Sequence, residues 1–149
     1  MRRSDQRRLA VFALYQNDLT GRALDDLFER NTTEFTRNLA EQTLANREQL
    51  DELITANSRG WKLERIAPLE RNILRVAIHE MLHVEEVPNE VAMDEAVELA
   101  KRFCSADAPK FVNGILGTIL RSLPGVDVEL PMPNVDEETE PIESEEPKE

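Results

Sequence analysis

The chain has 149 residues, of which 40 % are hydrophobic and 5 % aromatic, and its formal net charge is −12. This composition suits one domain, or two small packed halves, with a mostly aliphatic core. The absence of any run of about 18 apolar residues excludes a membrane-spanning helix. The single cysteine, Cys104, excludes an internal disulfide and suits a reducing cytosol, so we expect a cytoplasmic protein.

Apart from its C-terminal tail, the chain predicts an all-α fold, because apolar residues recur at helical spacing and no segment alternates as a strand would. Ser4 is a suitable N-terminal cap for the first helix, and Gly21 is a suitable terminator. Pro88 suits the first turn of a later helix, and Ser105 or Asp107 can cap the last one. The predicted helices cover residues 4–20, 23–30, 33–57, 69–83 and 88–103, followed by a last helix that ends at 123.

Composition separates the body of the chain from a tail that begins after Pro124 and Gly125. Within the body, Gly60 and Trp61 form a break between predicted helices. Residues 126–149 contain ten acidic residues, one lysine and four prolines, so we predict a disordered acidic tail that cannot offset its ordering entropy by apolar burial. This tail is either a solubilising segment or a polyanion mimic that competes for a basic surface. The rest of the chain has a net charge of only −3, which leaves a nucleic-acid partner open.

The stretch HEMLH, residues 79–83, matches the H-E-x-x-H signature of zinc metalloproteases. Its two histidines are four residues apart and therefore share one helical face, as zinc ligands require. Glu80 has the position of a general base. Glu95 or Glu98, on the next predicted helix, is a candidate third ligand.

Several observations favour a chance match to this signature. Asn72 and Arg75 continue the polar stripe of His79 and His83, opposite the apolar face, which indicates a side exposed to solvent or to a partner. Arg75 would also place a positive charge one turn from the metal. The chain offers neither a substrate groove nor an edge strand for a peptide. We therefore predict no metal site and no protease activity.

Four arginines, Arg2, Arg3, Arg7 and Arg8, stand within the first eight residues. The helix macrodipole favours negative charge at an N-terminus, so each arginine there costs roughly a few tenths of a kcal/mol. Phosphate would satisfy both the guanidinium groups and the helix start, which indicates a nucleic-acid contact. A solvated, frayed start is the alternative. The apolar stretch LAVFALY that follows predicts a buried segment that would anchor the arginines to the fold.

The stretch EAVELAKRFCSADAPKFVNGILGTILR, residues 95–121, is more specific than amphipathicity requires. It resembles the NusB family of bacterial transcription antitermination factors, in which a stretch like NEAVELAKRFG…KFVNGVL occurs. The similarity extends through APLERNILRVAIHEML, LDELI and the arginine-rich start, and it covers nearly all of residues 1–125. The acidic tail lies outside it.

The resemblance implies an all-α fold of two small helical bundles packed together, which divide near Gly60 into residues 1–60 and 61–125. It implies a non-enzymatic protein without a cofactor, which binds the single-stranded RNA element boxA as a heterodimer with NusE, a small-subunit ribosomal protein. The complex would join RNA polymerase with other Nus factors and allow read-through of terminators, chiefly in ribosomal RNA operons. The alternative function is a helical protein-interaction module, such as a homodimer whose RNA surface is masked.

Site residues also follow from the resemblance, at the arginine-rich start and at the beginning of the last helix. Lys110 would contact a phosphate and Phe111 would offer a stacking plane, with core packing as the alternative for Phe111. His79 stands where the family often has a tyrosine, so HEMLH is interpreted as part of a protein-binding face. The implied RNA contacts are Arg2, Arg3, Gln6, Arg7, Arg8, Asp107, Lys110 and Phe111. The implied partner contacts are Tyr15, Arg75, His79, Glu80 and His83.

The sequence departs from the family pattern at a few positions. Asp94 stands where asparagine is usual, and Cys104 stands where glycine is usual. Ser4 and Asp5 interrupt an arginine run that some family members have in full. The resemblance therefore does not determine how tightly this chain binds RNA without NusE.

Overall fold

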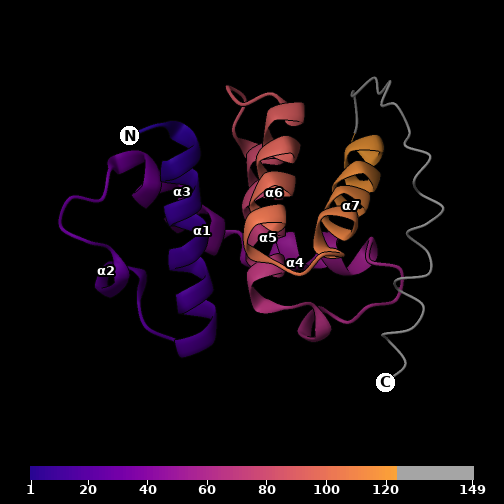
Figure 1. Cartoon of the computed structure of the whole chain (residues 1–149), viewed down its shortest axis with the longest axis horizontal. Coiled ribbons are helices and arrows are strands. Elements are labelled where there is room, and N and C mark those ends of the chain that lie inside the picture. Colours follow the sequence, from indigo (N-terminus) through magenta and orange to yellow (C-terminus); the bar gives the residue numbers. More distant parts are fainter. Residues whose placement is uncertain (124–149) are drawn as a thin grey trace.

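The computed structural model describes residues 1–123 and contains helices but no strand in that range (Figure 1). The all-α prediction is therefore confirmed, whereas the predicted tail, residues 126–149, lies outside the described residues. No helix of the described part is both long and apolar enough to cross a membrane. The elements are α1 (Arg3–Thr20), α2 (Leu24–Leu27), α3 (Glu34–Ala45), α4 (Arg47–Ala56), a 3-10 turn η1 (Leu63–Arg65), α5 (Pro68–His83), α6 (Asn89–Phe103) and α7 (Ala108–Ser122).

The first helix, α1, ends at Gly21 as predicted. Gly21 has a φ of 78°, a left-handed conformation that glycine adopts without a Cβ penalty, and its N–H donates to the carbonyl oxygen of Asn17 at 2.9 Å. The prediction that Ser4 caps this helix is wrong, because α1 begins at Arg3. The Ser4 hydroxyl instead donates to Glu95 Oε2 on α6 at 2.8 Å, so a tertiary contact has taken the place of a local one.

The helix predicted over residues 33–57 is in fact two helices, α3 and α4, separated by Asn46. Thr33 caps α3, because its side-chain oxygen accepts a hydrogen bond from the Thr36 N–H at 3.2 Å. Asn46 leaves helical geometry, with φ −102° and ψ 15°, and its Nδ2 donates to the Gln42 carbonyl oxygen at 3.1 Å. Asparagine competes with the backbone for hydrogen bonds in this way. The break turns α4 toward α5.

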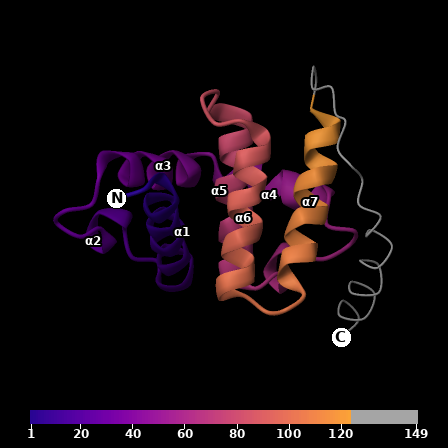
Figure 2. The ribbon, with the colours of Figure 1, turned by 45° about the horizontal axis from the view of Figure 1, so that its top comes forward.

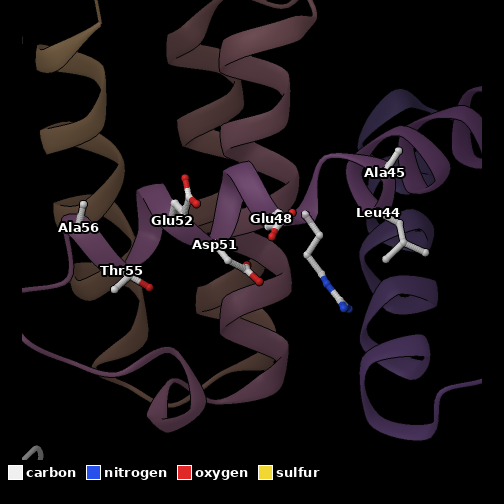
Figure 3. Close-up of a pocket in the computed structure, with 8 residues that line it drawn as sticks. Leu44, Ala45, Glu48, Asp51, Glu52, Thr55 and Ala56 are labelled. Carbon is white, nitrogen blue, oxygen red and sulfur yellow. The ribbon is translucent and has the colours of Figure 1, made fainter.

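The helices form two groups that meet at α5. In Figure 1, α1, α2 and α3 lie at one side of the molecule and α6 and α7 at the other, with α5 behind α6. Helix α4 lies with the second group, since it runs across α5 and reaches η1 (Figure 3). One continuous apolar cluster includes residues from both groups. The division into bundles 1–60 and 61–125 therefore stays a prediction. In the structure, the chain passes from the first group of helices to the second at Asn46, between α3 and α4.

Helix α5 is the centre of the core, because α1, α3, α4, α6 and α7 all pack against it. Every residue from 72 to 81 is buried as a result, including polar residues on the side away from the apolar stripe. Leu74 and Ile78 are completely buried. Neighbours on several sides therefore cover both the apolar and the polar side of α5 over residues 72–81.

Candidate nucleic-acid interface

Arg3 is exposed at the start of α1 and is held over an aromatic ring from another helix. Its guanidinium carbon lies 4.0 Å from the centroid of the Phe35 ring, at the start of α3. Such a cation–π contact contributes roughly 0.5–1 kcal/mol at an exposed site. Arg3 Nη1 also donates to Gln6 Oε1 at 3.5 Å. The side chain is therefore positioned in advance while it remains accessible.

Gln6, a predicted RNA contact, is buried and links α1 to the beginning of α3. Its Nε2 donates to the Met1 carbonyl oxygen at 2.9 Å, and its Oε1 accepts from the Thr33 hydroxyl at 2.7 Å. Its backbone carbonyl oxygen accepts from the Thr36 hydroxyl at 3.0 Å. The predicted RNA contact of Gln6 stays a prediction, while its burial against α3 favours a positioning role. Gln6 fixes the first turn of α1.

Arg7, also a predicted RNA contact, is buried against α5 and α6. Its Nε and Nη2 donate to the Glu80 carboxylate at 2.9 Å each, and its Nη1 lies 3.7 Å from Glu95 Oε1. Only 5 % of Arg7 is exposed. The RNA contact of Arg7 therefore stays a prediction, while its donors bind carboxylates inside the protein, which favours a positioning role. The sequence pattern placed Arg3 and Arg7 on one helical face but did not show that α5 covers the second of them.

Arg2 and Arg8 both lie beside Asp5. Arg2 is exposed, with its Nε 3.8 Å from Asp5 Oδ2, and the half-buried Arg8 donates from Nη2 to Asp5 Oδ1 at 3.3 Å. Such partly exposed pairs contribute little to stability, because solvent screens them. The start of α1 therefore presents Arg2, Arg3 and part of Arg8 to solvent.

The second predicted RNA surface lies at the start of α7. Asp107 and Lys110 are exposed there, whereas Phe111 is half-buried and packs on the core. The Phe111 and Trp61 rings have centroids 5.9 Å apart at an angle of 60°. Phe111 therefore packs on the core and beside Trp61 while it keeps some exposed surface, and its stacking on an RNA base stays a prediction.

The two predicted RNA surfaces lie at the starts of α1 and α7, which are at opposite ends of the molecule (Figure 1). In Figure 1 and Figure 2, α1 begins at the upper end of the molecule, whereas α7 begins at the lower end. Helix α6 stands between α1 and α7 in both views. The structure therefore does not bring the surfaces together into one compact pocket, and a ligand that contacts both has to cross the face formed by α1, α6 and α7.

The polar stripe on α5 does not face solvent, contrary to the sequence-based expectation. Asn72, Arg75 and His79 are buried, and only His83 is exposed. Arg75 donates from Nε to Asp51 Oδ1 on α4 at 2.7 Å and from Nη1 to Asp18 Oδ2 on α1 at 2.9 Å. Glu80 is buried as well, in its pair with Arg7. The stripe is polar because its residue Arg75 pairs inside the protein with carboxylates from α1 and α4.

Asp18 is the centre of this interior ion network. It accepts hydrogen bonds from Arg71 Nε at 2.9 Å and from Asn72 Nδ2 at 3.0 Å, in addition to Arg75. Burial by itself disfavours the charged carboxylate. The hydrogen bonds from Arg71 and Asn72, with the charges of both arginines, outweigh that effect and lower the pKa of Asp18 to about 2. The network ties the end of α1 to the beginning of α5.

His79 and His83 do not form part of a metal centre in the described region. Their ring centroids are 5.1 Å apart, and His83 Nε2 is 3.0 Å from Gln49 Oε1. Burial, with a smaller effect from His83, lowers the pKa of His79 to about 4, and its Nδ1 has no hydrogen-bond partner among residues 1–123. Within that range no three histidine, cysteine, aspartate or glutamate side chains are grouped as a metal ion requires.

Two other surface features are the predicted partner residue Tyr15 and a hollow beside α4. Tyr15 is half-buried on α1, so part of its ring is accessible. A shallow hollow follows α4 and is lined by Leu44 and Ala45 at the end of α3 and by α4 residues such as Glu48 and Glu52 (Figure 3). None of the predicted site residues lines this hollow.

The position of Phe35 under Arg3 was not predicted from the sequence. It lies two residues after the cap Thr33, on a helix far from Arg3 in sequence. An aromatic residue near a helix start is ordinarily interpreted as core. Only the packing of α3 on α1 shows that this ring supports Arg3.

A sequence profile of the NusB family matches residues 4–121, nearly all of the described region. The chain belongs to the NusB family. It is 42 % identical over 142 residues to the transcription antitermination protein NusB of Symbiobacterium thermophilum, an alignment that covers 84 % of this chain and 93 % of that protein. It is 40 % identical over 130 residues to the protein of the same name from Bacillus cereus strain B4264, with 83 % and 100 % covered.

Solved NusB structures share the fold described above. NusB of T. maritima has a TM-score of 0.73 at 31 % identity, covering 82 % of this chain and 92 % of that one. NusB of Aquifex aeolicus has a TM-score of 0.72 at 27 % identity, covering 90 % and 97 %. A crystal structure of the antitermination factors NusB and NusE in complex with double-stranded RNA gives 0.71 at 24 % identity, covering 83 % and 100 %, which shows the fold alone. The resemblance drawn from residues 95–121 is confirmed, and the NusB relatives are antitermination proteins rather than enzymes.

Proposed function

We propose that this chain is a cytoplasmic antitermination factor that binds boxA-like single-stranded RNA together with the ribosomal protein NusE. The complex would join RNA polymerase and promote read-through of terminators, chiefly in ribosomal RNA operons. Membership of the NusB family supports antitermination, and the NusB of a complex with NusE and RNA suggests both partners. The observation that carries RNA binding is the exposed Arg3, held over Phe35 at the start of α1.

The proposed RNA surface consists of the accessible residues at two helix starts. Arg2, Arg3 and Arg8 supply guanidinium groups at α1, and guanidinium forks match phosphate oxygens. Lys110 supplies an ammonium group at α7, and the exposed part of Phe111 offers a plane for an unstacked base. Gln6 and Arg7 act as positioning residues in this proposal. Asp107, which is exposed at the same helix start, also belongs to the proposed α7 surface.

The proposed NusE face consists of accessible residues above the interior polar network. Tyr15 and His83 have exposed surface, and we propose that they contact the partner directly. Arg75, His79 and Glu80 are buried, and Arg75 and Glu80 join α5 to α4 and α1 through Asp51 and Arg7. They would affect NusE binding through the position of α5 rather than by contact.

The test is the salt dependence of RNA binding by the NusE complex. Arg3→Ala and Lys110→Ala are compared with Arg22→Ala, an exposed arginine just beyond the opposite end of α1. Each lost phosphate contact lowers the slope of log affinity against log salt by roughly 0.7 for a single strand. We expect this reduction and weaker binding for the first two variants only.

Two results would overturn the proposal. Equal affinities and slopes for all three variants would show that these cations do not contact RNA. The second result has two parts: the chain is dimeric in solution, and its stable complex with NusE binds no boxA-like RNA. This result would favour the protein-interaction module instead.

A further inference from the structure

An exposed aromatic side chain stands at the end of α6, beside α1. Phe103 is 39 % exposed, and its ring meets that of Phe12 edge to face, with centroids 5.1 Å apart and an angle of 82°. The guanidinium carbon of Arg102 lies 4.9 Å from the Phe103 ring centroid. The contact with Phe12 on α1 therefore holds the Phe103 ring in place, while part of Phe103 stays accessible to solvent.

Phe103 differs in this respect from the other phenylalanines, all of which belong to the described part of the chain. Phe12, Phe28, Phe35 and Phe111 are half-buried against the core, whereas Phe103 is exposed. Leaving an aromatic side chain in water forfeits stabilisation of about 25 cal/mol per Å² of apolar surface. A ligand that covers the ring would recover it.

The seam between α1 and α6 connects this ring to the arginine-rich start. The Ser4–Glu95 hydrogen bond and the Phe12–Phe103 contact show that α1 and α6 run side by side in the same direction. Arg8 lies one helical turn before Phe12 on the same side of α1. Its Nε is buried and has no hydrogen-bond partner within residues 1–123. From Arg3 to Phe12 the rise along α1 is about 14 Å.

Phe103 also lies between the two surfaces proposed to bind RNA. Only the short loop of residues 104–107 separates it from the start of α7, where Lys110 is exposed. Helix α6 lies between α1 and α7 in Figure 2. A strand that runs along α1 from Arg3 and crosses the end of α6 to reach Lys110 therefore passes Phe103, the last residue of α6.

We propose that Phe103 and Arg102 form a stacking platform for one unpaired base of the RNA, with Arg8 and Arg102 beside the adjacent phosphates. Single-stranded RNA is recognised by stacking of its bases on aromatic rings and on arginine guanidinium planes. The inference rests on the proposed RNA-binding function and adds a third contact region on α6. A cation in the last turn of a helix also complements the macrodipole, which explains a charge at Arg102 but not its place over an exposed ring.

The experiment measures boxA-like RNA binding by the NusE complex at several salt concentrations. Phe103→Leu keeps the apolar contact with Phe12 but removes the aromatic plane, and Phe103→Tyr keeps both. Val91→Ala is the matched control, because Val91 is an exposed apolar residue at the other end of α6, 41 % accessible. We expect Phe103→Leu to weaken binding roughly five- to 100-fold with an unchanged salt slope, and Phe103→Tyr to bind within about twofold of the original chain. Arg102→Gln should lower the salt slope by roughly 0.7.

The outcomes separate the platform from the wider RNA-binding proposal. If Arg3→Ala weakens binding while Phe103→Leu binds like Val91→Ala, RNA binding stands and the platform is wrong. If Phe103→Leu and Phe103→Tyr weaken binding equally, or if Phe103→Leu lowers the thermal midpoint and the helical circular dichroism, the ring has a packing role and the platform is also wrong. If the original complex does not bind the RNA, both proposals fail.

Discussion

Arg7 and Glu80 form a bidentate ion pair inside the protein that joins α1 to α5, with Nε–Oε1 and Nη2–Oε2 distances of 2.9 Å. Their side chains are only 6 % and 1 % exposed. Arg3, one helical turn earlier, is exposed over Phe35. Two arginines on one face of α1 therefore have different roles, since Arg7 holds the fold together and Arg3 is accessible to a ligand.

Arg7→Met should destabilise the protein without a direct effect on RNA contacts. Removal of one partner from a buried ion pair leaves the other charge uncompensated, which typically costs about 3–5 kcal/mol. Urea denaturation checks this value. The double variant Arg7→Met with Glu80→Leu is the control, because it removes both charges and should recover much of the loss. A single variant as stable as the original chain would contradict the structural role of the pair.

Phe35→Leu should weaken RNA binding by removing the ring beneath Arg3. The arginine keeps its charge, so the salt slope should stay unchanged, while loss of a cation–π contact worth roughly 0.5–1 kcal/mol lowers affinity about two- to fivefold. Phe28→Leu is the matched control, since Arg37 lies 5.0 Å from the Phe28 ring centroid, away from the proposed RNA surface. Equal affinity of the two variants would show that the Phe35 ring does not prepare Arg3 for RNA.

His79 should make the fold less stable in mild acid. Its pKa is about 4 in the folded protein and 6.5 in an unfolded chain, so the unfolded state binds a proton first as the pH falls. Stability is therefore fully present above about pH 6.5 and declines between there and about pH 4, by about 2 kcal/mol at pH 5. His79→Phe should flatten this decline at little cost at pH 7.5, because the buried Nδ1 has no partner among the described residues to lose. Urea denaturation at pH 5 and pH 7.5 measures the decline in stability, and the exposed His83→Gln is the control. If stability declines as steeply in His79→Phe as in the original chain, other groups cause the acid sensitivity.

Asp18 should contribute to acid denaturation in a lower pH range. Its pKa falls from 3.8 to about 2 on folding, so its stabilising effect is present above about pH 4 and is lost as the pH falls through 2. Asp18→Asn should remove this part of the pH dependence. It should also destabilise the protein at pH 7 by roughly 1–3 kcal/mol, because Arg71 and Arg75 lose a charged partner. Acid titration of the circular dichroism signal for both chains measures the effect, and an unchanged acid midpoint would be the contrary result.

Sequence reasoning predicted most of the helices and the family because those signals are local. Gly21 ends α1 through its own backbone freedom, and helical spacing of apolar residues predicts α5, α6 and α7 within a few residues of their observed bounds. The wording of residues 95–121 indicated the NusB family without any knowledge of packing. The break at Asn46 was not predicted, because apolar residues continue on both sides of it.

The sequence by itself determined an all-α chain of the NusB family with arginines gathered at its start. Tertiary structure alone decided which of those arginines is accessible and where the polar stripe of α5 points. Periodicity tells which residues share a face of one helix, but not which other helix covers that face. Arg7 and Arg75 are buried because Glu80, Asp18 and Asp51 meet them from other helices, where a low dielectric surrounding makes each charge depend on its partner. Arg3 remains exposed, with its guanidinium group over the Phe35 ring and a hydrogen bond to Gln6 on its own helix.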